Sequence, residues 1–194
     1  MAWANALKLN VDLMVVSEPN KKICSSGEWI TDEEKDIAVK IINKQVKVHK
    51  VNKRKNYVHL MLDGVQVYAI YVSPNIPIQI FKNRIDEVME DVAIQSGGII
   101  VMGDFNAKSP IWGTPKADIR GEYVEEWLAQ TSFTAINNGE PTFIRGTTRS
   151  HIDVTLSPIN FQGKIKNWEV KYENPFTYHG HIYFAVESNT RVKR

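Results

Sequence analysis

The sequence predicts an α+β protein in which β-sheets pack against one another and against a few helices. Strand-like segments outnumber helical ones, and the two kinds alternate along the chain instead of forming separate blocks. Two segments, 13–17 and 99–102, are continuous apolar runs of strand length, a pattern typical of strands buried on both faces. The chain of 194 residues is expected to form one domain, residues 1–187, followed by a basic tail, residues 188–194.

The first half of the chain is expected to contain mainly strands. A short helix is expected over residues 3–9, and the polar residues 19–34 are expected to form a long loop after the first buried strand. Strand patterns then follow, and the last two flank Asp63-Gly64, a dipeptide typical of a type I′ hairpin turn. These strand-like segments are 37–42, 46–51, 57–62 and 65–72.

Hydrophobic periodicity predicts two amphipathic helices in the second half. The first is opened by Pro77 and ended by Gly97-Gly98. The second is marked by Val124, Trp127 and Leu128, and three closing strands are expected at 152–156, 164–171 and 182–186. The residues that share one face of the first helix are Ile78, Phe81, Ile85, Val88, Met89 and Val92.

Composition excludes several classes of protein. The chain has 24 Lys and Arg against 22 Asp and Glu, a net charge of +2, so any contact with nucleic acid must come from local charge. The single cysteine, Cys24, excludes a disulfide within the chain and a multi-cysteine zinc site. No apolar run approaches the roughly 18 residues that a membrane-spanning helix needs, and no secretory signal is visible.

The most informative motif directly follows the 99–102 strand and reads Gly103-Asp104-Phe105-Asn106-Ala107. Asp104 and Asn106 are two residues apart, so in an extended chain their side chains point to the same side. The carboxylate can orient or deprotonate a water molecule, and the amide can hold that water or a phosphate oxygen. Taken alone, the motif is equally compatible with an Asx-turn after a strand.

Further polar side chains stand at other strand ends. Glu18 follows the 13–17 strand, and a carboxylate there can hold Mg²⁺, which prefers hard oxygen ligands. Tyr71 can donate to a phosphate, and an Asp153–His179 pair would raise the pKa of the imidazole and leave a cation facing developing negative charge. Taken singly, each also has a structural interpretation, as a solvated glutamate, a half-buried core tyrosine, or a surface or core histidine.

In chain order, these strand ends resemble the endonuclease/exonuclease/phosphatase superfamily, and more narrowly the apurinic/apyrimidinic-like endonuclease domain of insect non-LTR retrotransposons. The resemblance runs from about residue 1 to about residue 187 and is most specific between Gly103 and Asp153. The segments that carry it are Val16-Ser17-Glu18-Pro19, Tyr71-Val72-Ser73-Pro74-Asn75, residues 103–113, Arg120-Gly121 before Glu125-Glu126-Trp127-Leu128, residues 141–146, and Ser150-His151-Ile152-Asp153.

The resemblance implies a four-layered α/β/β/α sandwich with a site at one end of two facing sheets. It implies Mg²⁺-dependent nicking of double-stranded DNA, with Mn²⁺ as an alternative ion. Phosphoryl transfer needs a metal and donors aimed at developing charge more than a covalent nucleophile. Carried over residue by residue, the implied roles are metal binding by Glu18, phosphate binding by Tyr71, water activation by Asp104, water orientation by Asn106, and transition-state stabilisation by His179 paired with Asp153.

The sequence departs from the family pattern at two places. The family begins with a strand that carries a metal-binding Asn, and this chain is expected to lack that first strand. The family's Ser-Asp-His motif is expected where Thr177-Tyr178-His179 stands. The spacing from His179 to Ile182 favours His179 as the motif's histidine, with His181 as the alternative. A tyrosine cannot replace a metal-coordinating carboxylate, so both departures bear on activity and leave the fold assignment unchanged.

Two groups of residues are expected to contact DNA. Residues 44–55 read KQVKVHKVNKRK, a local basic field that could follow a DNA backbone, although lysines are also common on solvated edge strands. The second group lies in or beside the segments that carry the resemblance; of these, Trp112 could instead cover the core. The expected DNA contacts are Ser150, Thr142, Arg145, Trp112, Arg120, Lys47, Lys50, Lys53 and Arg54.

Three functions remain open at the level of sequence. The Trp112 loop and the Arg120-Gly121 segment favour a Mg²⁺-dependent DNA endonuclease that nicks target sites, as in retrotransposon integration. The expected missing strand and Tyr178 favour a catalytically impaired or inactive remnant that folds and could bind DNA. The third is a phosphatase or phosphodiesterase of the same superfamily. In each case the chain is expected to be intracellular, and nuclear if it acts on chromosomal DNA.

Overall fold

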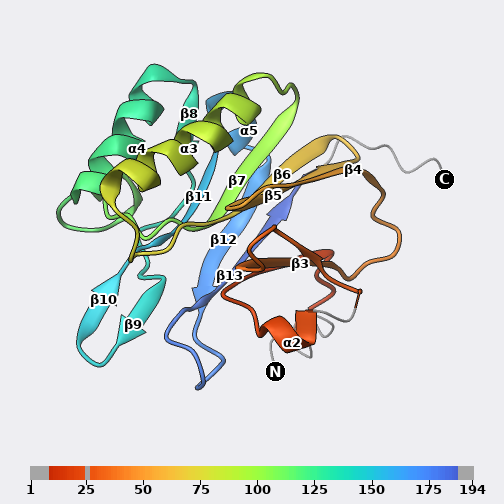
Figure 1. Cartoon of the computed structure of the whole chain (residues 1–194), viewed down its shortest axis with the longest axis horizontal. Coiled ribbons are helices and arrows are strands. Elements are labelled where there is room, and N and C mark those ends of the chain that lie inside the picture. Colours follow the sequence, from red (N-terminus) through yellow and green to blue (C-terminus); the bar gives the residue numbers. More distant parts are fainter. Residues whose placement is uncertain (1–8, 25–26, 188–194) are drawn as a thin grey trace.

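The computed structural model describes residues 9–24 and 27–187 of the chain (Figure 1). The expected helix over residues 3–9 therefore lies outside the described residues, except for Leu9, which is in a turn. The basic tail, residues 188–194, also lies outside them. Within the described ranges, no helix combines the length and the apolar character needed to cross a membrane.

A six-stranded sheet forms the centre of the molecule. Only the β6–β7 pair is parallel, and the other strand pairs are antiparallel. Two long helices, α3 (Ile78–Ala93) and α4 (Ile119–Gln130), cover one face of this sheet (Figure 1). In spatial order the strands are β4 (Val48–Lys53), β5 (Tyr57–Leu62), β6 (Val65–Tyr71), β7 (Gly98–Asp104), β11 (Asp153–Pro158) and β8 (Phe133–Ala135).

The central strands are buried on both faces, which is why their sequences are continuously apolar. On β6, Tyr68 and Ile70 join the core beneath the helices, whereas Val67 and Ala69 join a second core on the opposite face. This alternation follows from the two-residue period of a strand. The helix face predicted from periodicity enters the first core, with Ile78 only partly buried.

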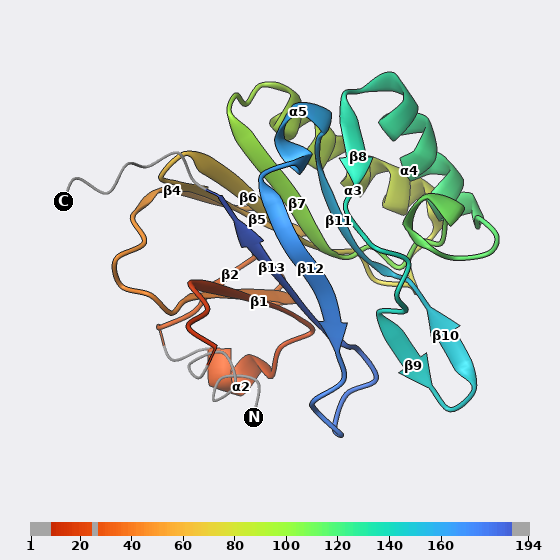
Figure 2. The same cartoon turned by 180° about the vertical axis from the view of Figure 1, so that it is seen from behind.

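The opposite face of the main sheet is covered by two smaller sheets (Figures 1 and 2). One has the order β1-β3-β2, and the other is the antiparallel pair β12–β13. On the outer side of the smaller sheets, the described residues form only one short helix, α2 (Lys21–Cys24), where the resemblance implies a full helical layer. The strands are β1 (Leu13–Ser17), β2 (Ile30–Thr31), β3 (Ile37–Ile41), β12 (Ile165–Lys171) and β13 (His181–Val186).

Several local predictions are wrong in detail. β1 is only half-buried, because it pairs with β3 alone among the described strands. The expected loop 19–34 contains both α2 and β2. Pro77 is the residue before the first helical position and not the first position itself. Only Gly64 of the hairpin turn has a left-handed φ, +78°, whereas a type I′ turn needs one at both central residues.

Besides α2 and β2, five short elements lie outside the predicted pattern, and one of them is the edge strand β8 (Phe133–Ala135). The 3₁₀ turn η1 (Pro110–Trp112) lies between β7 and α4, and α5 (Ile159–Gln162) follows β11. Strands β9 (Phe143–Arg145) and β10 (Thr148–Ser150) form a separate hairpin that projects beyond the main sheet (Figure 1). Three-residue strands give too little alternation for a periodicity argument to detect.

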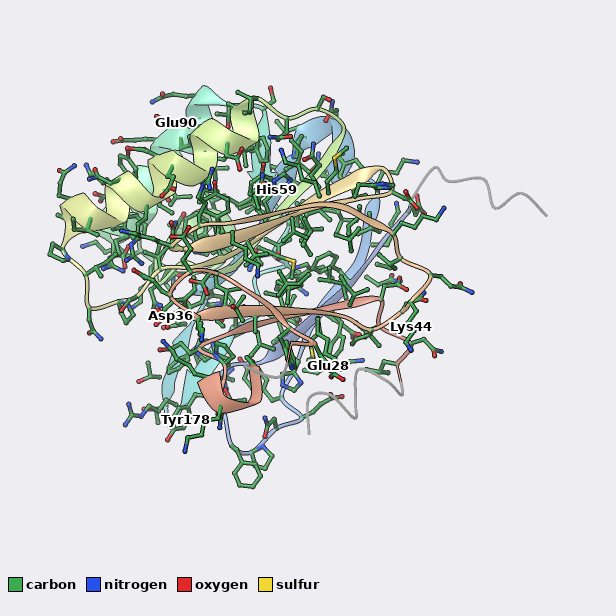
Figure 3. All side chains as sticks on the ribbon, turned by 45° about the vertical axis from the view of Figure 1, so that its right-hand side comes forward. Glu28, Asp36, Lys44, His59, Glu90 and Tyr178 are labelled. Atoms are coloured by element: carbon green, nitrogen blue, oxygen red, sulfur yellow. The ribbon has the colours of Figure 1, made fainter. Side chains whose placement is uncertain are left out.

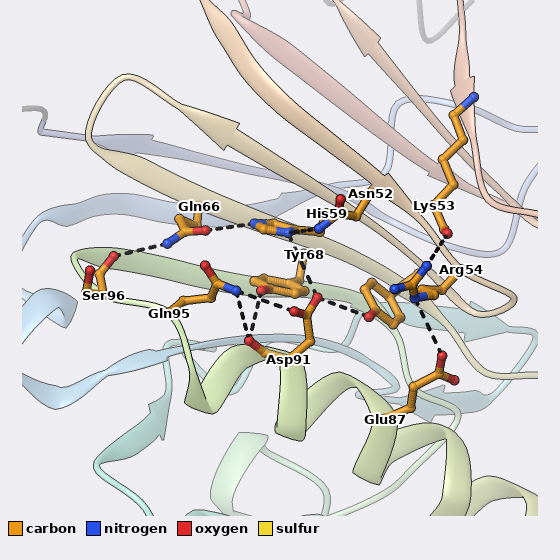
Figure 4. Close-up of polar contacts among 11 residues, drawn as sticks. Asn52, Lys53, Arg54, His59, Gln66, Tyr68, Glu87, Asp91, Gln95 and Ser96 are labelled. Carbon is orange, nitrogen blue, oxygen red and sulfur yellow. Dashed lines mark hydrogen bonds and ion pairs between the residues drawn. The ribbon is translucent and has the colours of Figure 1, made fainter.

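A buried polar network fastens α3 to the sheet. Figure 3 shows Glu90 on the outer side of α3 and His59, from β5, inside the molecule. The His59 ring stacks on Tyr68 with ring centroids 4.2 Å apart, and its Nε2 lies 2.8 Å from Oε1 of Gln66 (Figure 4). Tyr57 donates to Oδ2 of Asp91 on α3 at 3.0 Å. Burial lowers the pKa of His59, consistent with a neutral ring in this network.

Strands β6 and β7 make a very close backbone contact near the C-terminal end of β7. Gly103 has a φ of +142°, and a Cβ atom at this position would lie 1.9 Å from the carbonyl oxygen of Ile70. Only glycine combines this backbone conformation with so close a contact. The residue that follows Gly103 is Asp104, so this contact helps to fix the position of the candidate catalytic motif.

We predict that Gly103→Ala lowers the free energy of unfolding by about 3 kcal/mol, because it adds backbone strain and a clash with β6. Chemical denaturation monitored by circular dichroism would measure the change. Gly163→Ala is the matched control, since Gly163 has a helical φ of −64° and open space around its Cα. A Gly103→Ala protein as stable as the Gly163→Ala protein would contradict the prediction.

Candidate active site

Strand register brings three of the predicted site residues into one row. Tyr71 at the end of β6 is the register partner of Asp104 on β7, and Asp104 is the register partner of Asp153 on β11. Residues paired in this way on adjacent strands have neighbouring side chains on the same face of the sheet. The row lies at one end of the main sheet, where the sequence analysis placed the site.

Asp104 and Asn106 are held by hydrogen bonds around the end of β7. Asp104 is only 2% exposed, and its Oδ1 accepts from the backbone N–H of Asn106 at 2.9 Å. Asn106 has a left-handed φ of +47°, and its Nδ2 donates to the carbonyl oxygen of Val72 at 3.2 Å. The motif is therefore also an Asx-turn. The turn leaves Oδ1 of Asn106 without a bond to any described residue.

Asp153 and His179 form a close pair. His179 Nδ1 lies 3.0 Å and 3.2 Å from the two carboxylate oxygens of Asp153. The backbone N–H of Asp153 donates to Oγ1 of Thr142, and the His179 ring meets the Phe143 ring edge-on at 5.0 Å. The alternative histidine, His181, lies instead 3.9 Å from Glu173. Of the two, His179 is the histidine that the fold brings to the row.

Glu18 reaches the row from the opposite layer of the sandwich. Its backbone has a left-handed φ of +49°, and its N–H donates to the carbonyl oxygen of Asp36 on the neighbouring turn. Its Oε1 accepts from the hydroxyl of Tyr71 at 2.8 Å. The Tyr71 hydroxyl, expected to donate to a phosphate, therefore donates to Glu18 in this state. Burial, reinforced by Glu18, raises the pKa of Tyr71.

The site brings the carboxyl groups of Asp104 and Asp153 close together in a buried environment. Burial raises the pKa of Asp104 to about 7, and the carboxylate of Asp153 adds to this while His179 opposes it. Burial lowers the pKa of His179, but the hydrogen bond and charge of Asp153, with smaller contributions from Asp104 and Glu18, outweigh burial and raise it overall. The imidazole therefore carries the positive charge that partly balances the carboxylates.

The donor set fits a divalent cation. One ligand atom from each of Asp104, Asp153 and His179 lies within 4.8 Å of the others. The charge of Glu18 acts on both Asp104 and His179, so a third carboxylate is within electrostatic range. Hard carboxylate oxygens are the ligands that Mg²⁺ prefers, and a bound cation would favour the ionised form of Asp104. The carboxylates of this set are thus chemically suited to hold Mg²⁺ or Mn²⁺, whereas a protonated His179 is a hydrogen-bond donor and not a ligand.

Three of the expected DNA contacts are used inside the protein. Trp112 is 1% exposed, and its Nε1 donates to the carbonyl oxygen of Ala107. Arg120 is 9% exposed, and its guanidinium donates to three carbonyl oxygens of the loop after β6, those of Ser73, Pro74 and Ile76. Thr142 is fully buried beneath Asp153. In this structure Trp112, Arg120 and Thr142 therefore support the loops around the site, and their contact with DNA stays a prediction.

The remaining expected contacts divide between two places. Ser150 and Arg145 belong to the β9–β10 hairpin, where Arg145 is exposed and Ser150 is buried. The basic segment lies along edge strand β4, three strands away from β7 in the main sheet. Figure 3 shows Lys44, the first residue of this segment, well away from Tyr178, which precedes His179. The expected contacts there, which are all exposed, are Lys47, Lys50, Lys53 and Arg54, and Arg54 lies 4.0 Å from Glu87.

Two supporting residues were missed by the sequence analysis. Asn137 bridges the end of β8 and β11, because its Nδ2 donates to the carbonyl oxygen of Asp153 and its Oδ1 accepts from the N–H of Thr155. Phe143 packs against the His179 ring, and its backbone forms an isolated β-bridge with His179. The Asn138-Gly139 turn next to Asn137 was the only sequence signal, and it indicates a turn but no bridging role.

The raised pKa of Asp104 gives a prediction about stability without metal. Its folded pKa of about 7 exceeds its ordinary value near 4, so this carboxyl destabilises the fold progressively as pH rises from about 4 through 7. In EDTA, Asp104→Asn should raise the melting temperature by roughly 5 °C at pH 8 and by much less at pH 5. Thermal melts at both values measure this, and an equal change at both would contradict the assigned cause.

The Asp153–His179 pair gives a second prediction. Because Asp153 is the main group that raises the pKa of His179 against the effect of burial, Asp153→Asn should lower that pKa and shift protonation of the ring to lower pH. Titration of the imidazole resonances by NMR in EDTA would measure the shift. Glu173→Gln, which removes the carboxylate beside His181, is the matched control and should leave the pKa of His179 unchanged. An equal response to both substitutions would contradict the pairing.

Comparison with solved structures agrees with this architecture. The endonuclease domain of TRAS1, a telomere-specific non-LTR retrotransposon, superposes with a TM-score of 0.79 at 21% identity, covering 96% of this chain and 91% of that chain. An AP endonuclease from Archaeoglobus fulgidus gives a TM-score of 0.73 at 10% identity, covering 95% and 92%. A variant of the 3′ phosphatase NExo from Neisseria, bound to product DNA hairpin, gives a TM-score of 0.68 at 14% identity. The superposition covers 96% of this chain and 93% of that chain. At these identities the likeness establishes the fold alone.

Comparison at the level of sequence establishes the family. A stretch of 88 residues, 44% of this chain, is 32% identical to the RNA-directed DNA polymerase from mobile element jockey of Drosophila melanogaster. The match spans 9% of that curated relative, so the chain corresponds to a small part of its length. Residues 65–183, more than half of the chain, match the family model described as Endonuclease-reverse transcriptase. The chain therefore belongs to the Endonuclease-reverse transcriptase family, with the fold of the endonuclease/exonuclease/phosphatase superfamily.

Proposed function

We propose that this chain is a Mg²⁺-dependent endonuclease domain that nicks double-stranded DNA at the insertion site of a non-LTR retrotransposon. The observation that carries the proposal is the row Tyr71, Asp104 and Asp153, completed by His179 on one side and Glu18 on the other. Membership of the Endonuclease-reverse transcriptase family supports the same reaction class. This nicking reaction would take place inside the cell, and in the nucleus if the target is chromosomal DNA.

Glu18 is the proposed metal ligand, within electrostatic range of Asp104 and His179. When bound, Mg²⁺ would supply charge neutralisation for the phosphodiester group. Tyr71 holds Glu18 in place through the hydroxyl that it donates to Oε1. A phosphate entering the site would compete with Glu18 for the hydroxyl of Tyr71. Tyr71 would then donate to the phosphate, as expected from the sequence.

Asp104 is the proposed general base. Asp104 is buried at the centre of the row, and its ionised form, which a bound cation would favour, can accept a proton from water. Asn106 accompanies it around the same turn and has an amide oxygen that no described residue engages. That oxygen is available to orient the attacking water by accepting a hydrogen bond from it.

His179 is the proposed donor to the phosphate. Its Nδ1 faces Asp153, which leaves Nε2 without a partner among the described residues. The raised pKa keeps the ring protonated to higher pH than a free histidine. A cationic donor held by a fixed carboxylate stabilises the negative charge that develops on phosphate oxygens in the transition state.

A second candidate function is DNA binding without cleavage. The observation that favours it is Tyr178, which stands where the resemblance implies a carboxylate and is 53% exposed. In this alternative the fold and the DNA surface remain, while catalysis is weak because one carboxylate is missing. A nicking assay separates the two candidates directly.

We predict that the purified chain converts supercoiled plasmid to nicked circles in Mg²⁺ and that EDTA abolishes the reaction. Asp104→Ala should lower the rate by roughly 1,000-fold, because it removes the proposed general base. Asp63→Asn is the matched control and should nick like the parent, because Asp63 lies in the turn before β6, at the opposite end of that strand from Tyr71. Gel quantification of nicked circles measures the rates.

Two outcomes would change the assignment. Full activity in a folded Asp104→Ala protein would show that the proposed base is wrong. A folded parent that binds plasmid but leaves it intact in both Mg²⁺ and Mn²⁺ would favour the second candidate, DNA binding without cleavage.

A further inference from the structure

The backbone around Tyr178 is fixed to the β9–β10 hairpin. The N–H of Ile144 donates to the carbonyl oxygen of Tyr178 at 2.8 Å, and the N–H of Gly180 donates to the carbonyl oxygen of Thr142 at 2.8 Å. The hydroxyl of Thr177 accepts from the N–H of His179 at 3.1 Å. Tyr178 is therefore held in a bend directly next to the histidine proposed to contact the phosphate.

The side chains at this bend form one continuous array. The Phe143 ring lies between the rings of its two neighbours, with centroids 5.0 Å from His179 and 5.9 Å from Tyr178. The guanidinium carbon of Arg145 lies 5.3 Å from the centre of the Tyr178 ring. Phe143 and Arg145 are two residues apart on β9, so they share one face of the hairpin. The array thus leads from the candidate active site to an exposed tyrosine and arginine.

The outer end of the array is open. Tyr178 is 53% exposed and Arg145 is exposed, in contrast to Trp112 and Arg120, which are buried and engaged with carbonyl groups. Figure 3 shows Tyr178 at the margin of the molecule. An aromatic ring with a guanidinium group over one face is suited to stack a flat, electron-rich partner on its other face.

We propose that Tyr178 and Arg145 form a platform on which one nucleobase of the DNA substrate stacks after it is unstacked from the duplex, next to the phosphate at His179. Aromatic rings and arginine planes stack with any base because every base offers a π-face, and the arginine adds attraction for the backbone. The proposal rests on the proposed function and deepens it, because it assigns a substrate-positioning role to the tyrosine that stands in place of the expected carboxylate. The platform positions DNA and takes no part in the chemical step.

Binding of fluorescein-labelled DNA in EDTA tests the platform without any cleavage. Tyr178→Leu keeps an apolar side chain but removes the aromatic face, so it should weaken binding about fivefold or more at a fixed salt concentration. Tyr178→Phe should bind within about twofold of the parent, because stacking needs the ring and not the hydroxyl. Phe176→Leu is the matched control, since Phe176 is 81% exposed in the same connection but lies outside the array. Its binding should equal that of the parent.

The salt dependence distinguishes stacking from simple charge. Arg145→Gln should reduce the slope of log K against log salt by about one, whereas Tyr178→Leu should leave the slope unchanged. In addition, DNA carrying 2-aminopurine should show a fluorescence change on binding to the parent and to Tyr178→Phe, and this change should be absent with Tyr178→Leu. Circular dichroism melts establish that each variant is folded.

The outcomes separate this inference from the proposed function. Equal affinity and equal 2-aminopurine response in parent and Tyr178→Leu would overturn the platform, even if the parent nicks DNA. Loss of binding by Tyr178→Phe equal to that of Tyr178→Leu would overturn it too, since the hydroxyl would then be the contact. A parent that binds through Tyr178 but never nicks would retain the platform and reject the nuclease. A folded parent that binds no DNA would reject both.

Discussion

The burial of Asp104 beside a second carboxylate is the constraint around which one end of this molecule is organised. Two carboxyl groups on adjacent strands repel one another, and burial removes the water that would otherwise screen them. The protein offsets this cost with the imidazole of His179 and with the hydrogen bond from the Asn106 backbone. A cation would offset the remainder, which explains why acidic groups of this kind are tolerated in the interior.

The layers of the sandwich converge on this same point. Tyr71 belongs to the main sheet, Glu18 follows the first strand of a smaller sheet, and their hydrogen bond joins the two across the site. His179 comes from a third unit, since it precedes β13 and is bridged to the β9–β10 hairpin. The main sheet contributes Tyr71, Asp104 and Asp153, and the other two units contribute Glu18 and His179, so the geometry of the site depends on the packing of all three units. The close contact of Gly103 with β6 fixes the position of β7, the strand that carries Asp104.

Local patterns in the sequence were sufficient for the long helices and strands, but not for the short elements or for the tertiary contacts between elements. The alternation on β6 and the helical spacing of Phe81, Ile85 and Val88 are properties of single elements, so periodicity could predict them. The pairing of Glu18 with Tyr71 joins residues 53 positions apart and depends on how two sheets meet. Arg120 and Trp112 were expected at a DNA surface because such residues are common there. Their burial follows from tertiary contacts with the loop after β6 and with Ala107, which no local pattern records.

The β9–β10 hairpin is anchored at its base and open to solvent at its turn. Its base is joined to the site through the contact of Phe143 with His179, whereas its turn at Gly146 has a left-handed φ of +59° and no atom within 4 Å of the position of a Cβ. Residues added or exchanged at this turn would meet solvent instead of the core. The exposed positions of the hairpin can therefore vary while the carboxylates stay in register, whereas Gly146 itself is constrained by its left-handed φ.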